Sequence, residues 1–434
     1  MIIELDRRTL GLVKGKKFRS DAERYIEAYE DFMKSAAETG VPVAEDFTDS
    51  AMKEKIVAMG GTEANSCASI SYGKLSPACV DCRTGARSKT VFYTLACNRD
   101  CFFCANRNQE EYDRYTKGMN DALAELYDSE PESGYSSIAL TGGEPLLNPE
   151  KALSFFTVVS DRYPEAHKRL YTNGDLLTDE IAKHLAEAGL DEIRISIKPG
   201  VKLAGSDTLE KLSLAKCHIP YVMVEMPVLP GSVEEMKNLF RKLEEIGVDG
   251  INILEFLYPW VNADEYAAAG YRLKARPYRV LYSYSYAGGL PIAGSEEACL
   301  ELLEFALKNG MRLNVHYCSL ENKLTSQIYH QNAMAKLMPF EVMSPRDFFI
   351  KTARVYGSAV NRVKKQLDKS GIAGYHESEE YLEFHPCHIT ALTDIDEIAL
   401  TSNVVEYDEN GALLLRELKL DLVHPADFYY EKDI

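Results

Sequence analysis

Short apolar segments and amphipathic segments alternate along the middle of the chain. Between residues 91 and 257, runs typical of buried strands alternate with segments whose apolar residues recur at helical spacing. Six such β-then-α units predict a parallel sheet with crossover helices. Six strands are too few for a closed eight-stranded barrel. The pattern therefore leaves two architectures, a partial barrel and a doubly wound open sheet.

The predicted elements of this region follow one another without long gaps. The strands are predicted at 91–96, 136–143, 168–174, 191–199, 220–230 and 249–257. The helices between them are predicted at 109–128, 148–163, 177–189, 208–218 and 232–247. Each loop that follows a strand lies at the edge of the sheet where α/β proteins bind their ligands.

The pattern differs on both sides of this region. Residues 20–57 predict helix, and the Gly-, Ser-, Cys- and Pro-rich stretch that follows predicts irregular structure. We therefore expect three parts: an N-terminal helical and Cys-containing segment (1–88), a central α/β domain (89–257) and a C-terminal α+β extension (258–434). Within the extension we predict helices at 295–309 and 321–336, a strand at 311–318, and a hairpin at 404–418 that turns at Asn410–Gly411.

Composition and charge narrow the classes of function. The 46% hydrophobic and 27% charged content is typical of a globular protein. The net charge of −18 argues against a nucleic-acid-binding surface, which needs clustered Lys and Arg. No run of 18 apolar residues predicts a membrane span, and the N-terminus lacks the apolar centre of a secretory signal. We expect a cytoplasmic protein, in which clustered cysteines serve as metal ligands or catalysts more often than as disulfides.

Three cysteines lie within eight positions after the first predicted strand. They are Cys97, Cys101 and Cys104, with the spacing C-x3-C-x2-C. Three thiolates can hold three irons of a [4Fe–4S] cube and leave the fourth iron open to a substrate or cofactor. A structural zinc site is an alternative, but it needs four ligands and is usually built from paired C-x2-C units. A chance group of buried thiols is the other alternative.

A second motif, Thr141-Gly142-Gly143-Glu144-Pro145, ends the second predicted strand. Glycines at this position let a ligand approach the backbone closely. The Glu144 carboxylate could pair with an ammonium group. Taken alone, the motif is also compatible with a simple turn.

Together, in this order and at these strand ends, the two motifs resemble the radical S-adenosylmethionine (SAM) enzymes over residues 91–257. The resemblance implies a partial (βα)6 TIM-type barrel, which the six units fit. It implies a [4Fe–4S] cluster on the three cysteines, with the amine and carboxylate of SAM on the open iron. It implies anaerobic chemistry in which an electron donor such as flavodoxin or ferredoxin drives SAM cleavage. The product is a 5′-deoxyadenosyl radical that abstracts hydrogen from a substrate.

The resemblance also assigns SAM contacts by position. Phe103 matches the aromatic residue that lies against adenine, and the other assigned residues lie at the ends of the second, third and fourth strands. These residues are Gly142, Gly143, Glu144, Pro145, Asn173, Ser196 and Lys198. No residue is assigned to the hydrogen transfer itself.

Other cysteines predict a second metal site. Cys79 and Cys82 form a C-x2-C upstream of the triplet, and Cys318 ends the strand predicted at 311–318. The chain is similar to a group of archaeal and bacterial radical SAM proteins related to pyruvate-formate-lyase activators, in which such a pair and a late His-Tyr-Cys occur together. The resemblance implies that Cys79, Cys82 and Cys318 hold a second iron–sulfur cluster. Its fourth ligand is open among Cys67, Cys387, His316 and a non-protein ligand, and ordinary buried thiols are the alternative.

Residues 258–294 are rich in aromatic side chains, which predicts either a lid over the barrel mouth or packing against the barrel. The aromatic residues are Tyr258, Trp260, Tyr266, Tyr271, Tyr278, Tyr282, Tyr284 and Tyr286. The same segment carries four cations, which predict either recognition of a carboxylate or phosphate or a solvated loop. They are Arg272, Lys274, Arg276 and Arg279.

The predicted function is hydrogen abstraction from a small-molecule metabolite. Modification of a peptide or protein side chain is the alternative, and the absence of an N-terminal peptide-binding module favours the metabolite. A glycyl-radical activase is usually a shorter chain than these 434 residues. An iron–sulfur carrier or zinc protein would need neither the Gly-Gly-Glu-Pro motif nor the barrel. No Asp-x-His-x-x-Gly occurs, so cobalamin is not expected.

Overall fold

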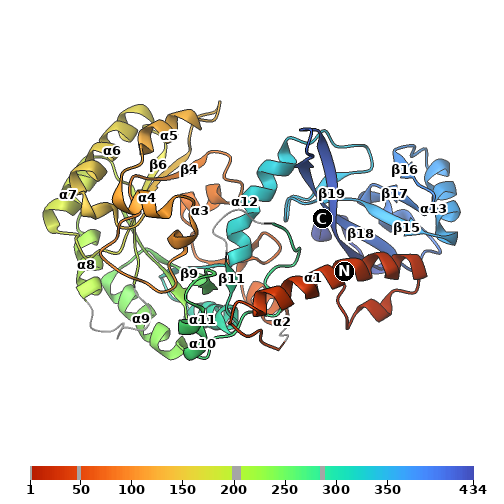
Figure 1. Cartoon of the computed structure of the whole chain (residues 1–434), viewed down its shortest axis with the longest axis horizontal. Coiled ribbons are helices and arrows are strands. Elements are labelled where there is room, and N and C mark those ends of the chain that lie inside the picture. Colours follow the sequence, from red (N-terminus) through yellow and green to blue (C-terminus); the bar gives the residue numbers. More distant parts are fainter. Residues whose placement is uncertain (1, 46–49, 198–206, 284–288) are drawn as a thin grey trace. The chain divides into compact units, whose positions relative to one another are not determined.

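The computed structural model describes residues 2–45, 50–197, 207–283 and 289–434 (Figure 1). It divides the chain into two compact units. We call Thr39–Pro277 with Tyr284–Ser326 the barrel unit. Met1–Glu38, Tyr278–Ser283 and Gln327–Ile434 form the antiparallel unit.

A nine-stranded sheet forms the centre of the barrel unit, in the order β2-β3-β12-β9-β8-β7-β6-β5-β4. All neighbours from β4 to β12 pair in parallel, whereas β2 and β3 pair antiparallel. The strands are Thr62–Ala64 (β2), Ser69–Tyr72 (β3), Ser88–Phe92 (β4), Ser137–Thr141 (β5), His167–Thr172 (β6), Glu192–Ile195 (β7), Tyr221–Val228 (β8), Gly250–Glu255 (β9) and Asn314–Cys318 (β12). A short separate pair consists of Leu257–Tyr258 (β10) and Leu290–Pro291 (β11).

Crossover helices cover one face of this sheet and bury its apolar side chains, such as Leu170, Ile193 and Ile251 (Figure 1). The helices of the barrel unit, of which α3 lies on the other face of the sheet, are Ser50–Ala58 (α2), Pro77–Cys82 (α3), Tyr112–Lys117 (α4), Ala122–Asp128 (α5), Pro149–Arg162 (α6), Asp179–Glu187 (α7), Asp207–Lys216 (α8), Val233–Ile246 (α9), Ala263–Ala268 (α10) and Ser295–Asn309 (α11). Helix α12 (Leu320–Ala333) follows β12. The predicted α/β fold with a parallel, partial-barrel sheet is confirmed.

The face of the sheet opposite the crossover helices is polar. Successive strand residues point to opposite faces, so Arg169 on β6, Glu192 and Arg194 on β7, and Asn252 on β9 lie on the side away from Leu170 and Ile193. All four are buried. We call this inner face the polar bore of the barrel unit.

The units differ from the predicted boundaries at 88 and 257. Strand β12 pairs in parallel with β9, and β3 pairs with β12. The barrel sheet therefore contains strands from both predicted flanking parts, 1–88 and 258–434. In the other direction, Ile2 of β1 pairs with Val423 of β19 in the antiparallel unit. A periodicity analysis detects elements but not pairings between distant segments, which is why the boundaries were misplaced.

Two predicted helices are each divided in two. The segment 20–57 forms α1 (Lys16–Ala37) and α2, which belong to different units. The segment 109–128 forms α4 and α5, because Gly118 ends the first of them in an extended conformation. The helix predicted at 295–309 is confirmed by α11.

The antiparallel unit contains a second sheet, in the order β1-β19-β18-β15-β17-β16, with β14 paired to β18 and β13 paired to β14. Its strands are Ile2–Ile3 (β1), Val342–Met343 (β13), Ile350–Lys351 (β14), Ala353–Tyr356 (β15), Tyr375–Glu377 (β16), Tyr381–Phe384 (β17), Ile398–Tyr407 (β18) and Leu413–Val423 (β19). Its other helices are Ser358–Lys369 (α13) and Tyr430–Asp433 (α14). The predicted Asn410–Gly411 hairpin is confirmed, and its strands are longer than expected.

We searched the helices of the described residues for a membrane span. None combines the length and the apolar character needed to cross a bilayer.

Candidate active site

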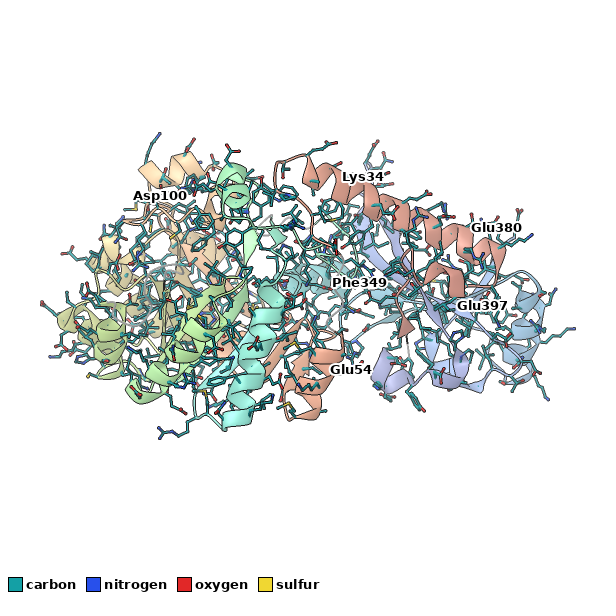
Figure 2. The ribbon with its side chains drawn as sticks, turned by 90° about the horizontal axis from the view of Figure 1, so that it is seen from below. Lys34, Glu54, Asp100, Phe349, Glu380 and Glu397 are labelled. Carbon is teal, nitrogen blue, oxygen red and sulfur yellow. The ribbon has the colours of Figure 1, made fainter. Side chains whose placement is uncertain are left out.

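The three cysteines of the triplet lie in the loop after β4. Cys97 is exposed, whereas Cys101 and Cys104 are partly buried. Burial raises the pKa of Cys104, and a negative charge on Cys97 raises it further, so these two thiols lie within electrostatic reach of each other. Asp100, which Figure 2 labels, points outward from the loop and pairs with Arg107.

The Gly-Gly-Glu segment after β5 is hydrogen-bonded to the chain just before Cys97. The amide of Gly143 donates to the Thr94 carbonyl at 3.0 Å, and the amide of Glu144 donates to the Ala96 carbonyl at 2.8 Å. On the far side of the triplet, Asn106 donates its side-chain amide to the Gly142 carbonyl at 2.7 Å. The motif therefore holds the cysteine loop at both ends.

These contacts explain why two glycines are needed here. A Cβ on Gly142 would lie 2.2 Å from the Thr94 carbonyl oxygen, and one on Gly143 would lie 2.0 Å from that of Ala96. Gly142 also has a φ of +134°, which side chains rarely adopt. The close approach that the glycines permit is that of the β4 loop itself, whereas the sequence analysis had considered a ligand.

We predict that Gly143→Ala destabilises the protein by about 1–3 kcal/mol, because the added methyl group meets a backbone carbonyl that cannot move aside easily. Urea denaturation measures the change. Gly11→Ala is the matched control, since Gly11 has open space at its Cβ position. Equal stability of the two variants would contradict this account of the motif.

Glu144 is fully buried and its carboxylate is already hydrogen-bonded. Its Oε1 accepts from the Leu146 amide at 2.8 Å and from the Thr172 hydroxyl at 2.7 Å. Its Oε2 accepts from the Asn173 amide at 2.7 Å. The side chain thus connects the ends of β5 and β6, which is a different role from the ammonium contact considered in the sequence analysis.

The end of β6 contacts the cysteine loop directly. Asn173 points its side-chain amide at the Cys97 sulfur, 3.8 Å away, and donates to Asn98 at 2.7 Å. Arg99 binds the Ser196 carbonyl at 3.3 Å and Asp175 at 2.8 Å. Asn173 and Ser196 therefore lie at the triplet, as the strand order predicts.

Three further residues are predicted to contact SAM: Phe103, Pro145 and Lys198. Pro145 is buried and its carbonyl accepts a hydrogen bond from Tyr93. Lys198 lies outside the described residues. Phe103 is partly exposed and packs edge-on against Phe102 and Phe256, with ring centroids 5.2 and 5.8 Å apart.

The aromatic residues after β9 pack rather than form an open lid where the structure describes them. Tyr258 and Tyr266 are buried, and Tyr266 lies against Phe102 of the cysteine loop at 5.1 Å. Asn262 donates to the Phe102 carbonyl at 2.8 Å, so this segment supports the loop from a further side. Tyr284 and Tyr286 lie outside the described residues.

One cation of the predicted basic stretch is committed to a structural role. Lys274 pairs with Glu255 at 3.1 Å and also with Glu296, and both carboxylates are buried. It is therefore not a solvated anchor for a ligand.

The second group of cysteines comes together in the polar bore. Burial raises the pKa of Cys318 to about 12, and negative charge on Cys82 and Cys79 contributes to this rise. The three thiols therefore lie within electrostatic reach of one another, although α3 and β12 are more than 230 residues apart in the sequence. Of the proposed fourth ligands, His316 lies close enough to help lower the pKa of Cys79, and its ring nitrogens contact Asn252 at 3.0 Å and Ser69 at 2.8 Å.

No three His, Cys, Asp or Glu side chains converge on a single metal-ion position anywhere in 2–45, 50–197, 207–283 and 289–434. A [4Fe–4S] cube makes a different demand, because each thiolate binds its own iron atom. The donor set of Cys97, Cys101 and Cys104 fits such a cube, with three thiols on one loop beside a partly open surface.

Arg194 is the centre of a dense ionic network in the bore. Its guanidinium contacts Glu192 at 2.5 Å and Glu225 at 2.6 Å, and it donates to the Cys79 sulfur at 3.0 Å. Burial alone would raise the pKa of Cys79, but the charge of Arg194, together with His316 and Arg169, outweighs burial and the pKa falls to about 6. Asn252 also donates to Glu225, at 2.8 Å.

Arg169 lies on the neighbouring strand β6 and, unlike Arg194, is not part of an ion-pair network. It is only 4% exposed, yet its guanidinium makes no hydrogen bond or ion pair with any described residue, and its Nε is fully buried without a partner. It stacks over the Tyr171 ring at 4.7 Å. Burial raises the pKa of Cys82, and the positive charge of Arg169 opposes part of this rise.

The sequence analysis missed both arginines. A signal was present on β7, where the charged residues 192 and 194 alternate with the apolar residues 193 and 195, but not on β6, where the charged residues 168 and 169 are adjacent. In a parallel sheet covered by helices, such alternation indicates a polar interior face. It does not indicate which charge will be paired.

Residues 91–254 match the family model of the Radical SAM superfamily. The barrel unit therefore carries a radical SAM domain. The cofactors of such a domain are a [4Fe–4S] cluster and SAM.

Two relatives by sequence carry more specific names. A protein of Methanocaldococcus jannaschii with the provisional name "glycyl-radical enzyme activating enzyme" is 26% identical over 298 residues, 66% of this chain and 75% of the relative. A GTP 3′,8-cyclase of Nautilia profundicola is 30% identical over 174 residues, 38% of this chain and 49% of the cyclase. The chain thus matches only about half the length of the cyclase.

Solved structures resemble this chain only distantly. Streptococcus suis SuiB bound to its precursor peptide SuiA has a TM-score of 0.38 and 12% identity, covering 58% of this chain and 53% of SuiB. Coproporphyrinogen III oxidase of Escherichia coli has a TM-score of 0.35 and 14% identity, covering 54% and 55%. Because both TM-scores lie below 0.5, we draw nothing about activity from these two structures.

Proposed function

We propose that the enzyme holds its [4Fe–4S] cluster on Cys97, Cys101 and Cys104 and abstracts hydrogen from a small anionic metabolite bound in the polar bore. When bound, the cluster supplies the electron that cleaves SAM to methionine and a 5′-deoxyadenosyl radical. The chain's own residues position the loop, contact SAM and exclude water from the radical.

The SAM contacts that we propose fall into two groups. Phe103, Asn173, Ser196 and Lys198 contact SAM directly, as the family resemblance suggests. Gly142, Gly143, Glu144 and Pro145 act mainly by fixing the cysteine loop, because their backbone and side-chain groups are hydrogen-bonded to it or to β6. This division rests on the contacts of each residue.

The observation that carries the proposed substrate class is the unpaired guanidinium of Arg169. A buried charge without a partner costs several kcal/mol, so such groups are retained where a ligand completes them. The neighbouring Arg194 has its carboxylate partners already, and Arg169 is therefore the cation available to a carboxylate or phosphate. Such a group would anchor a metabolite with its C–H bonds toward the mouth of the barrel.

The test compares small acids with their neutral analogues. After anaerobic reconstitution, 5′-deoxyadenosine formed from SAM under reductant is measured with panels of carboxylates and phosphates and with the matching amides and alcohols. We expect an acid to raise the rate at least about tenfold above the uncoupled rate. Arg169→Met should remove this stimulation and leave the uncoupled rate unchanged. Stimulation by a neutral analogue, or by a peptide alone, would contradict the proposal and favour side-chain modification.

A second candidate for the bore is a second iron–sulfur cluster on Cys79, Cys82 and Cys318. The mutual electrostatic influence of the three thiols favours it, and Arg169 and Arg194 would then offset the negative charge of the thiolates. The fourth ligand stays open, with His316 nearest to the group through Cys79.

Iron content distinguishes the two candidates. If the bore binds the metabolite, we expect about four irons per chain after reconstitution, and Cys79→Ala should not lower this number. About eight irons, falling to about four in the Cys79→Ala variant, would show that a second cluster occupies the bore. Cys217→Ala is the control, because Cys217 is exposed just after α8.

A further inference from the structure

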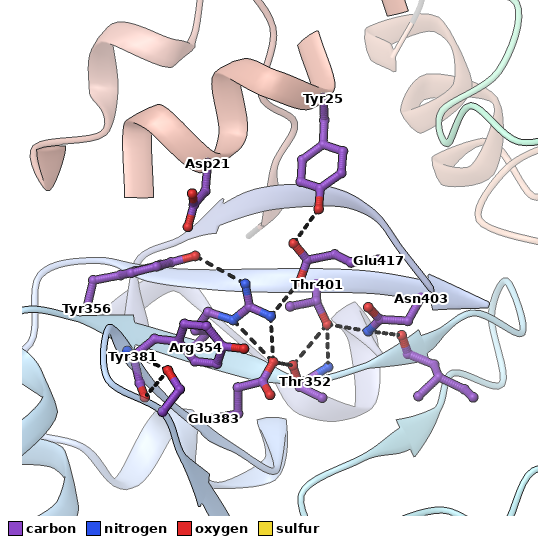
Figure 3. Close-up of polar contacts among 12 residues, drawn as sticks. Asp21, Tyr25, Thr352, Arg354, Tyr356, Tyr381, Glu383, Thr401, Asn403 and Glu417 are labelled. Carbon is purple, nitrogen blue, oxygen red and sulfur yellow. Dashed lines mark hydrogen bonds and ion pairs between the residues drawn. The ribbon is translucent and has the colours of Figure 1, made fainter. Parts of the chain in front are cut away.

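The antiparallel unit contains a cavity of about 350 Å³ between helix α1 and one face of its sheet (Figure 3). A volume of this size falls in the range of small-molecule pockets. The lining residues come from α1, from four sheet strands and from the segments beside them. They are Asp21, Arg24, Phe340, Glu341, Thr352, Arg354, Glu380, Tyr381, Glu383, Asn403, Leu415 and Glu417.

The buried cation of this cavity, Arg354, is fully committed to its neighbours. Its Nη2 pairs with Glu383 at 2.7 Å and with Glu417 at 2.5 Å, and its Nη1 donates to the Tyr356 hydroxyl at 3.3 Å (Figure 3). Its guanidinium carbon lies 4.1 Å from the Tyr381 ring centroid. With two carboxylates around it, Arg354 offers little to an incoming anion.

Hydrogen-bond acceptors, by contrast, are left over on the cavity wall. Glu383 accepts all three of its hydrogen bonds through Oε1, and its Oε2 accepts none from the described residues. Asp21 is 5% exposed and uses only Oδ1, toward Lys17 and Arg24. Asn403 is 4% exposed and donates twice through Nδ2, while its Oδ1 accepts no hydrogen bond from the described residues.

The net charge of the lining residues also favours a cationic ligand. Five carboxylates line the cavity and only two guanidiniums do, those of Arg24 and Arg354. Lys17 adds one more cation at the edge, where it pairs with Glu380 at 2.8 Å; Figure 2 labels Glu380. Including it, the acidic groups still outnumber the basic groups. Phe340, Tyr381 and Leu415 supply apolar wall for a hydrocarbon stem.

We propose that this cavity binds an organic cation, an ammonium or guanidinium group on an apolar stem of about the size of a lysine or arginine side chain. Each N–H of such a group can donate to Asp21 Oδ2, Glu383 Oε2 or Asn403 Oδ1, which no described residue satisfies. Charge-assisted hydrogen bonds of this kind are stronger than neutral ones.

The proposal concerns a site outside the barrel unit and does not depend on the proposed function. The cation can come from a free small molecule or from a basic side chain of a peptide. The probes separate these sources: spermidine represents the free amine, and N-acetyl-lysine amide and N-acetyl-arginine amide represent side chains. N-acetyl-glutamate amide is the anionic control.

Isothermal titration calorimetry of the full chain at low ionic strength tests the proposal. We expect at least one cationic probe to bind saturably and the anionic probe not to bind. Asp21→Asn should weaken the binding at least about tenfold, because it removes a charged acceptor and leaves the Arg354 pairs intact. Glu23→Gln is the matched control, a change of equal charge on the outer side of α1, where Glu23 pairs with Arg7.

A second variant guards against a local loss of structure. Glu383→Gln keeps an oxygen for Arg354 and Thr352 and removes the charge at the cavity wall, and we expect it to weaken binding as Asp21→Asn does. Absence of binding by every cationic probe would overturn the proposal. So would equal binding of the anionic probe, or equal effects of Asp21→Asn and Glu23→Gln.

Discussion

Replacing Cys97, Cys101 and Cys104 together by alanine will abolish the formation of 5′-deoxyadenosine from SAM. The cleavage of SAM needs an electron delivered at contact distance, and the loop after β4 carries the three thiolates that would hold the cluster. Without them the reconstituted protein should lose about four irons per chain. Product formation is followed by chromatography under anaerobic, reducing conditions, and iron is measured on the same samples.

The control for this prediction is the Cys217→Ala variant, which removes an exposed thiol just after α8, far along the chain from the triplet. It should retain both iron and activity. Circular dichroism should show the same secondary structure in the triple variant and the parent protein, because the loop is held by backbone hydrogen bonds from Gly143 and Glu144. Continued cleavage of SAM by the triple variant would refute the cluster assignment.

The sequence predicted the fold of the barrel unit well because its elements are local patterns. Strands β5, β8 and β9 are short, largely apolar runs, and α6, α7 and α9 show helical spacing between capping residues. The strand β12 was also predicted, but its membership of the barrel was not. That membership depends on the pairing of Val315 with Ile251 across more than sixty residues, and no local pattern encodes it.

The two motifs of the candidate site were likewise visible in the sequence, since spacing and strand position are local properties. Their physical roles were only partly predictable. Gly143 was interpreted as room for a ligand, whereas the structure gives that room to the Ala96 carbonyl. Glu144 was interpreted as an ammonium partner, whereas it binds groups of Thr172 and Asn173 on the next strand. Both roles arise from contacts between neighbouring β-to-α loops.

Sequence patterns do not show which buried charges form ion pairs with each other. Arg169 and Arg194 have the same type, similar burial and neighbouring strands, and from the sequence alone they are equivalent. The register sets Arg169 opposite Glu192 in the sheet, yet the carboxylate of Glu192 points its Oε1 to Arg194 and its Oε2 to His167. Arg194 therefore forms ion pairs within the sheet, whereas Arg169 has no hydrogen-bond or ion-pair partner among the described residues.

This difference leads to the second large effect. Arg194→Met should lower the free energy of unfolding by about 3–5 kcal/mol, because it leaves Glu192 and Glu225 buried without their cation. Arg169→Met should leave the free energy of unfolding unchanged or raise it by up to about 2 kcal/mol, because it removes a buried charge that has no partner. Urea denaturation of the two variants, prepared without iron or SAM, measures both effects.

The two variants serve as controls for each other, since each replaces a buried arginine on the bore by the same apolar side chain. A purely structural role for both arginines predicts that both variants are destabilised by similar amounts, and that result would contradict the assignment of Arg169 to a ligand. If Arg169 instead binds an anion, its loss costs binding rather than folding. The Arg169→Met protein should then be as stable as the parent and lose the stimulation of SAM cleavage by small acids.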